Sequence, residues 1–149
     1  MPIRYVHTNI VARDWRLLAQ FYETVFDCRP VLPARSLSGE WLEAGTAVPN
    51  ASLEGIHLRL PGFGEDGPTL EIFQYGHIES KLPSVANREG FGHLAFAVDD
   101  VEAKRANVLA NGGNDIGQIV EADIDGVGKR SFCYMADPEG NLIEVQKWG

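Results

Sequence analysis

Two segments of this chain repeat the same arrangement of a histidine and an aspartate. The segment YVHTNIVARD, near the start, and the segment GFGHLAFAVDD, in the middle, both place a histidine in a short apolar run. An aspartate follows seven positions later in each, so His7 leads to Asp14 and His93 leads to Asp100. Each aspartate can cap a following helix, because its carboxylate accepts hydrogen bonds from the first free N–H groups. The chain is therefore predicted to consist of two similar halves.

Each half also ends in a matching segment that carries a glutamate. The segments TLEIFQY (69–75) and LIEVQKW (142–148) place Glu71 and Glu144 four residues before an aromatic side chain. Short runs of this composition, bounded by turn-forming residues, predict strands. The duplication therefore pairs one histidine with one glutamate in each half.

Helices are predicted directly after the two capping aspartates. Residues with helical spacing form one apolar stripe in each case, and the second helix is expected to stop at Gly112 and Gly113. The first stripe consists of Leu18, Phe21, Tyr22 and Val25, and the weaker second stripe consists of Val101, Val108 and Leu109.

Further strands are expected near residues 29–32 and 55–60, and again near residues 117–121 and 127–136. The order strand, helix, three strands then occurs twice, which indicates the α+β class with two tandem βαβββ modules. We predict one domain over residues 1–149, made of module 1–76 and module 90–149 joined by a linker at 77–89. Residues 33–53 have no counterpart in the second half. Trp41 there is interpreted as packing for a long loop, with a place at the mouth of a ligand site as the alternative.

The histidines and glutamates are predicted to lie on the less aliphatic face of their strands, because successive side chains in a strand point to opposite faces. The alternation sets Leu94, Phe96 and Val98 against His93, Ala95 and Ala97, and it sets Ile143 and Val145 against Glu144. We expect the large apolar face to pack under the helix. The histidine and glutamate of each half then face away from it.

A carboxylate among aliphatic neighbours is costly to bury unless another group compensates its charge. Two such carboxylates, each matched to a histidine, suggest one shared divalent cation. Imidazole nitrogen and carboxylate oxygen both bind zinc, nickel, cobalt, manganese or iron, so the metal is one of these. The alternative is that each is an ordinary strand residue. His57 and His77 lack counterparts and are expected to lie outside the site.

Composition excludes several classes of function. The net charge of −8, from 21 acidic and 13 basic residues, disfavours nucleic acid as a partner. The start of the chain does not have the pattern of a signal peptide, and no apolar run is long enough to span a membrane. The two cysteines are interpreted as reduced thiols, with a single disulfide as the alternative. We expect a cytoplasmic protein.

The chain resembles the vicinal oxygen chelate superfamily, which contains glyoxalase I, methylmalonyl-CoA epimerase, extradiol dioxygenases and antibiotic-resistance proteins. The stretches YVHTNIVARDWRLLAQFYETVFDC, GPTLEIFQY, GFGHLAFAVDDVE and YMADPEGNLIEVQKW carry this resemblance. It implies a curved mixed-sheet cup around one metal ion, with a homodimer as the expected assembly. The ligand order of the superfamily falls on His7, Glu71, His93 and Glu144.

The set of four ligands resembles the ligand set of the isomerase and epimerase branch of this superfamily. The resemblance therefore implies a metal-dependent lyase, isomerase or epimerase that acts on a small carbonyl or thioester substrate. The metal would stabilise an enediolate, as Lewis acids do. Glu144 is the first candidate for the catalytic base and Glu71 the second.

Two other functions fit the same resemblance. One is a non-catalytic protein that binds an antibiotic or another small molecule, and the other is an iron-dependent extradiol dioxygenase. Cations that could anchor an acidic substrate are Arg13, Arg35, Arg59, Lys129 and Arg130, and a second acid–base group could come from Glu43 or Glu54.

Overall fold

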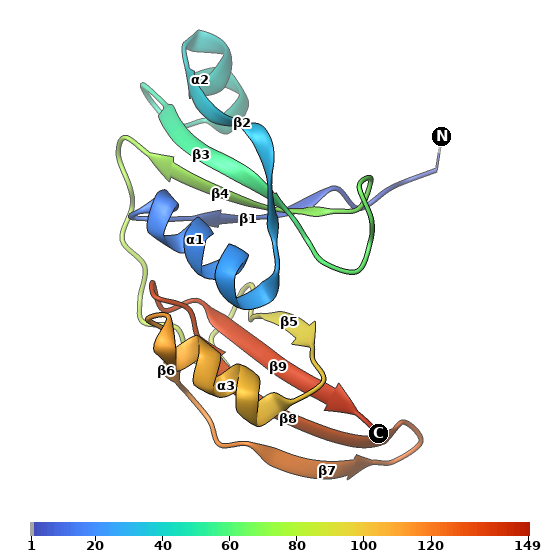
Figure 1. Cartoon of the computed structure of the whole chain (residues 1–149). Helices are drawn as coiled ribbons and strands as arrows, with labels where there is room; N and C mark the ends of the chain where they lie inside the picture. The colour runs from blue at the N-terminus through green and yellow to red at the C-terminus, as the bar shows by residue number, and fades with distance from the viewer. Residues whose placement is uncertain (1) are drawn as a thin grey trace. The chain divides into compact units, whose positions relative to one another are not determined.

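A computed structural model describes residues 2–149. The chain divides into two compact units, Met1–Ser80 and Lys81–Gly149. Each unit contains one mixed sheet with a helix against it (Figure 1). The predicted α+β class is therefore confirmed. The division between the units falls in a segment, 77–89, that contains no helix or strand.

The first unit contains a four-stranded sheet in the order β1-β4-β3-β2. The parallel pair is formed by β1 (His7–Val11) and β4 (Thr69–Tyr75), and both other pairs are antiparallel. The remaining strands are β3 (Ser52–Arg59) and β2 (Arg29–Ser38), whose pairing shifts register between Val31 and Arg35. Pro33 lies in that irregular stretch, where its missing N–H does not break a ladder hydrogen bond.

The second unit repeats this plan with β5 (Leu94–Ala97) parallel to β9 (Leu142–Trp148). The next strand is β8 (Gly128–Ala136), which pairs with β9, with the two-residue β6 (Asn114–Asp115) and with β7 (Val120–Ile124). All predicted strand regions are present. Their ends move by a few residues, because ladder hydrogen bonds rather than local composition decide where a strand stops.

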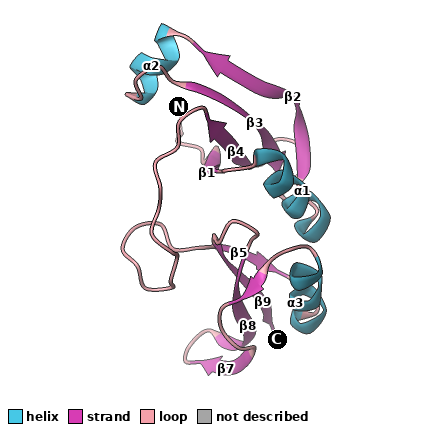
Figure 2. Cartoon of the chain, turned by 90° about the vertical axis from the view of Figure 1, so that its left-hand side faces the viewer, coloured by secondary structure: helices cyan, strands magenta, loops and turns pink. Residues whose placement is uncertain are grey.

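The helices α1 (Trp15–Phe26) and α3 (Val101–Ala110) begin at the predicted caps. Carboxylate Oδ1 of Asp14 accepts from Leu17 N at 3.2 Å, and that of Asp100 accepts from Ala103 N at 3.0 Å. Each helix packs on the two inner strands of its own sheet, α1 on β3 and β4, and α3 on β8 and β9 (Figure 2).

The sequence predicts the first apolar stripe more accurately than the second. Every member of the first stripe is buried, and so are Val101 and Val108 of the second. Leu109 is 39% exposed, so its assignment to the second stripe is wrong. A step of one residue turns a helix by about 100°, which carries Leu109 off the face that Val108 shares with Val101.

Residues 33–53 are more ordered than the sequence suggested. They extend β2 and form a short helix, α2 (Glu40–Thr46), whose Leu42 packs with Leu53 and Phe73. Trp41 is 62% exposed, so the residue that packs this segment is Leu42 and the interpretation of Trp41 as packing is wrong. Because Phe73 points away from α1, β4 is covered on both faces over Thr69–Phe73.

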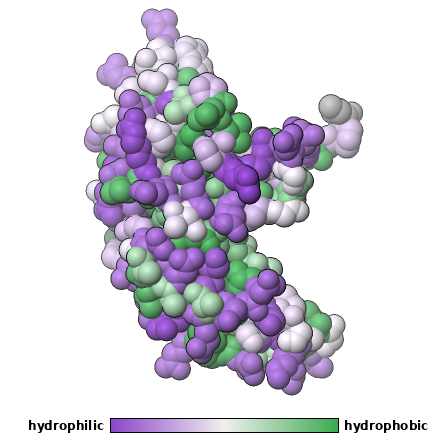
Figure 3. All heavy atoms as spheres, in the orientation of Figure 1, coloured by the Kyte–Doolittle hydropathy of each residue, from purple (hydrophilic) through white to green (hydrophobic). Residues whose placement is uncertain are grey.

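Polar side chains cover most of the face visible in Figure 3, where purple marks the hydrophilic residues. Within residues 2–149, no helix is long and apolar enough to cross a membrane. Cys28 and Cys133 are both free thiols and both buried, as predicted for reduced cysteines.

The two thiols should be inert in the folded protein. Burial, with help from Asp27 and Glu23, raises the pKa of the Cys28 thiol to about 12, and burial also raises the pKa of Cys133. The reactive thiolate is therefore almost absent near neutral pH. We expect neither cysteine to react with an aromatic disulfide reagent in native buffer, and both to react in denaturant. A reactive thiol in the native chain would contradict the burial.

The cap of α3 can be tested with a matched pair of variants. We expect Asp100→Ala to lower the free energy of unfolding by about 1 kcal/mol, because the first turn loses its acceptor. Asp100→Asn keeps a side-chain oxygen at the cap and should stay close to the wild type. Chemical denaturation followed by circular dichroism measures both, and equal losses would show that the cap does not contribute.

Candidate metal centre

The parallel pairing of β1 with β4 brings His7 to Glu71. Asn9 lies opposite Glu71 in this register, and His7 precedes Asn9 by two residues, so both side chains are on the face of Glu71. His7 Nε2 lies 3.5 Å from Glu71 Oε1, and Asn9 Nδ2 donates to the same oxygen at 2.8 Å. The predicted neighbourhood of His7 and Glu71 is therefore present.

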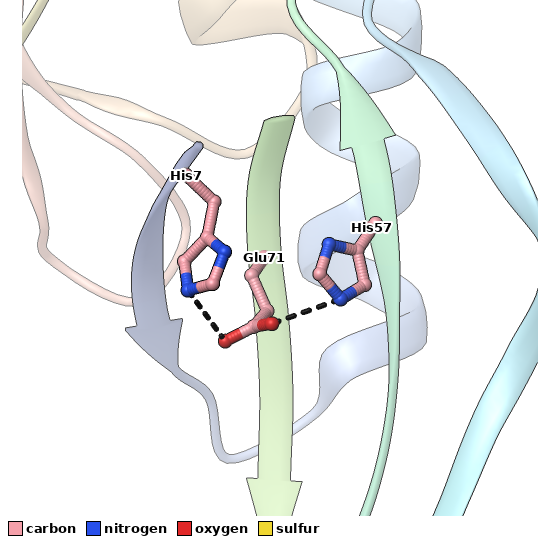
Figure 4. A group of neighbouring side chains, drawn as sticks. All are labelled: His7, His57 and Glu71. Carbon is pink, nitrogen blue, oxygen red and sulfur yellow. Dashed lines mark ion pairs between the residues drawn. The ribbon is translucent and has the colours of Figure 1, made fainter. Parts of the chain in front are cut away.

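His57 approaches Glu71 from the other side. It lies directly opposite Glu71 in the antiparallel pair of β3 and β4, and its Nε2 is 2.8 Å from Glu71 Oε2. Figure 4 shows His7 and His57 on either side of the glutamate, each joined to a different carboxylate oxygen. The expectation that His57 lies outside the site is thus wrong.

The geometry of β3 lets these side chains share one face. A Cβ on Gly55 would lie 2.7 Å from the Phe73 ring and 2.1 Å from the Ile72 carbonyl oxygen. Glycine is thus required at this position of β3, two residues before His57. The Phe73 ring then stands beside the His57 ring, with centroids 5.8 Å apart in an edge-to-face arrangement.

Glu71 is held as a buried, fully partnered carboxylate. It is 8% exposed, and each of its oxygens contacts at least one nitrogen. Burial lowers the pKa of His57, although the Glu71 carboxylate opposes this shift. An imidazole with a lowered pKa is neutral near neutral pH, which is the form that binds metals.

The second unit forms the same histidine–glutamate contact by the same register. Ala95 lies opposite Glu144 in the parallel pair of β5 and β9, and His93 precedes Ala95 by two residues. His93 Nε2 lies 3.3 Å from Glu144 Oε1, and Glu144 is 4% exposed. The second predicted pair is therefore also present.

The other neighbours of Glu144 differ from those of Glu71. Tyr134 occupies the position opposite Glu144, and its ring lies 4.7 Å from the His93 ring. Arg130 Nη1 forms an ion pair with Glu144 Oε2 at 3.2 Å, while its guanidinium lies 4.2 Å from the centroid of the Phe132 ring. Arg130 is one of the cations that the sequence offers as anchors for an acidic substrate, whereas nothing in the sequence pattern points to Tyr134.

Two buried polar atoms at this second pair have unused hydrogen-bonding capacity. Within residues 2–149, Glu144 Oε2 and Arg130 Nε make no hydrogen bond, although Glu144 Oε2 lies 3.2 Å from Arg130 Nη1 in the ion pair. A buried carboxylate oxygen without a hydrogen bond costs free energy, which a bound cation or a polar substrate group would recover.

The donor set fits a divalent cation. His7, His57 and Glu71 each offer one ligand atom, and these atoms lie within 4.8 Å of one another. Ligands at about 2.2 Å from one ion can be at most about 4.4 Å apart, so small side-chain rotations suffice. His93 and Glu144 offer the same donor types in the second unit. That both units bind a single shared ion stays a prediction from the duplication.

Sequence reasoning found the histidine–glutamate pairs because they occur twice, and it missed the residues that do not repeat. His57 has Tyr134 as its counterpart, so comparison of the halves gave no signal for a second histidine. The available signal was alternation, since His57 shares a face with Gly55 and Arg59, away from Ile56 and Leu58. Only the register of the β3–β4 pair shows that this face carries Glu71.

Comparison with known proteins gives a match along nearly the whole chain. The profile of the family described as Glyoxalase/Bleomycin resistance protein/Dioxygenase superfamily matches residues 4–145. Two proteins named "Putative glyoxylase CFP32", from Mycobacterium bovis and Mycobacterium tuberculosis, are 39% identical over 72 residues. That match covers 48% of this chain and 25% of each relative, so the matched half of the chain corresponds to about a quarter of their length.

Solved structures of the same fold cover the chain almost completely. A glyoxalase family protein from Bacillus cereus is 17% identical, covers 98% of this chain and 93% of its own, and has a TM-score of 0.72. A protein from the mobile metagenome of V. Pseudocholerae is 25% identical, and the match covers 100% of this chain and 98% of that protein, with a TM-score of 0.57. A mutant of the fosfomycin resistance protein FosX from Listeria monocytogenes is 16% identical, and the match covers 97% of this chain and 92% of that protein, with a TM-score of 0.56. That structure is a complex with Mn(II) and 1S,2S-dihydroxypropylphosphonic acid.

The importance of Arg130 for the buried Glu144 carboxylate can be measured by its removal. We expect Arg130→Met to lower the free energy of unfolding by about 3 kcal/mol, because one partner of a buried ion pair is lost while His93 remains. Lys129→Met is the matched control, since Lys129 and Glu121 are 3.8 Å apart and largely exposed. Such a pair contributes less than about 1 kcal/mol. Equal losses in chemical denaturation would contradict the role of Arg130.

Proposed function

The chain belongs to the Glyoxalase/Bleomycin resistance protein/Dioxygenase superfamily, and on this basis we propose that it is a divalent-metal-dependent isomerase, lyase or epimerase. Its substrate would be a small carbonyl compound or thioester. One observation supports this above all others. Each half sets a histidine beside a buried glutamate, through the same register of two parallel strands.

In this proposal His7, Glu71, His93 and Glu144 hold one divalent cation between them. The cation supplies Lewis-acid stabilisation of negative charge that develops on a substrate oxygen. The donors are imidazoles and carboxylates, which favour zinc, nickel, cobalt, manganese or iron. Mn(II) is the ion named with FosX, and this supports a divalent metal here without identifying it.

Glu144 is the proposed general base. It would take a proton from the carbon next to the substrate carbonyl, and the electron pair of the broken C–H bond would move toward the carbonyl oxygen. Returning the proton to the former carbonyl carbon, while the hydroxyl proton of the substrate moves to the former carbonyl oxygen, gives an isomer. A proton delivered to the opposite face of the original carbon by a second acid group gives an epimer. The hydrogen bonding of Glu144 Oε2 supports this choice, because within residues 2–149 that oxygen makes no hydrogen bond beside its ion pair with Arg130 at 3.2 Å.

Glu71 is the second candidate for the base, and its surroundings make it the weaker one. Both of its oxygens already accept from or contact nitrogen atoms of His7, Asn9 and His57. A carboxylate held from three directions is suited to fixed ligation rather than to carrying a proton. We therefore assign metal binding to Glu71 and both metal binding and proton transfer to Glu144.

The experiment is to load the purified chain with Mn²⁺, Co²⁺, Ni²⁺ or Zn²⁺ and to assay thiohemiacetals, acyl-CoA thioesters and hydroxyketones. We expect Glu144→Gln to retain metal and to lower kcat by roughly 10²–10⁴-fold, which is the usual contribution of a positioned base. Glu121→Gln, at the exposed glutamate beside Lys129, is the control and should leave turnover unchanged.

Three results would contradict the proposal. Unchanged turnover of metal-loaded Glu144→Gln would remove this residue from proton transfer. Protein that binds none of these metals would point to a non-catalytic small-molecule carrier of the same fold. Oxygen uptake with catechols in the iron-loaded chain would instead indicate a ring-cleaving dioxygenase.

A further inference from the structure

We propose that His57 is a metal ligand, so that the first half binds a divalent cation with His7, His57 and Glu71. This inference rests on the proposed function, because it adds a donor to the same metal centre. It differs from the four-ligand set in assigning three donors to one half and two to the other.

The first support is the position of the three side chains on adjacent strands. β1, β4 and β3 lie next to one another in the sheet, and His7, Glu71 and His57 project from the same face (Figure 4). Their ligand atoms lie within 4.8 Å of one another, and His57 Nε2 is nearer to the carboxylate than His7 Nε2, at 2.8 Å against 3.5 Å. Three donors converge on one point within a single compact unit.

The second support is the contact at the far side of the His57 ring. Nδ1 lies 3.0 Å from the hydroxyl oxygen of Thr69, the residue two positions before Glu71. A metal-binding histidine commonly uses its other ring nitrogen in a hydrogen bond that fixes the tautomer and the ring orientation. Without a metal, Nε2 donates to the Glu71 carboxylate, which can only accept. A metal at Nε2 would require the ring proton on Nδ1, where the hydroxyl oxygen of Thr69 can accept it.

The third support is that the ring is already restrained. The His57 side chain is 19% exposed, and its ring makes edge-to-face contacts with Phe73 at 5.8 Å and with His7 at 5.7 Å. A ligand held in place before the ion arrives loses little rotational freedom on binding. In the second half the equivalent position is Tyr134, whose neutral phenol is not among the usual ligands of zinc.

The consequence concerns how the two halves share the work. With His57 in the set, His7, His57 and Glu71 would hold the cation, and Glu144 could carry a proton without being needed to hold it. The first half would then supply most of the metal ligands, and the second half would supply the residue that transfers the proton. The two halves share one fold but would differ in function, because the residue opposite the glutamate is His57 in the first half and Tyr134 in the second.

The test is a titration of the metal-free full chain with Co²⁺, followed by calorimetry and by visible absorption. We expect His57→Gln to lower the Co²⁺ affinity by more than about 100-fold, beyond the roughly 10–100-fold that loss of an outer hydrogen-bond partner costs. The visible absorption of the cobalt-saturated variant should also change, because one nitrogen ligand is gone. His77→Gln is the matched control, since His77 is 79% exposed and pairs only with Glu79 in the part of the chain described.

Two further variants keep the inference testable if His57→Gln does not fold. Thr69→Val removes the partner of Nδ1 and should weaken Co²⁺ binding by about 10–100-fold. Glu144→Gln should still bind one Co²⁺ per chain, and the double variant with His57→Gln should not. A Thr69→Val chain with wild-type affinity would overturn the inference.

The remaining outcomes separate this inference from the proposed function. Unchanged cobalt absorption in saturated His57→Gln would show that His57 only positions Glu71, and the inference would fail. Unchanged affinity in His57→Gln, with affinity lost in His7→Ala, would overturn the role of His57 and leave the proposed function intact. A wild-type chain that binds no Co²⁺ would overturn both.

Discussion

The contact between a buried glutamate and an imidazole on the neighbouring parallel strand is the interaction on which this site depends. A carboxylate that is 4–8% exposed is costly without compensation, and His7 or His93 provides it at 3.5 or 3.3 Å. The parallel register determines this contact. In each half one residue pairs directly with the glutamate, and the histidine lies two positions before that residue, so its side chain is on the same face. Any slip of one residue would turn the histidine to the other face.

The helices make this register possible by covering the opposite face of each sheet. Leu18, Tyr22 and Val25 of α1 are fully buried, which fixes the aliphatic side of β3 and β4 toward the helix. The glutamate side is then the only one left for polar groups. In the first half Leu42 of α2 packs with Phe73 on that side, and Glu71 is also buried.

The halves share a frame and differ in what surrounds the glutamate. Glu71 has nitrogen partners on both oxygens, while Glu144 keeps one oxygen that makes no hydrogen bond. Arg130 beside Phe132 and Glu144 gives the second half a cation that the first half lacks at its glutamate. Because one fold can support many functions, we expect these non-repeated residues, rather than the duplicated plan, to decide what this chain does.

The sequence by itself determined the duplicated plan, the capping roles of Asp14 and Asp100, and the pairing of a histidine with a glutamate in each half. These features depend on local spacing and alternation, which a sequence displays directly. Only the tertiary structure decided that His57, Asn9 and Arg130 join the glutamates, and that residues 40–46 form a helix. The reason is that cross-strand partners depend on hairpin register and on a loop between the strands. Neither is fixed by the composition of a single strand.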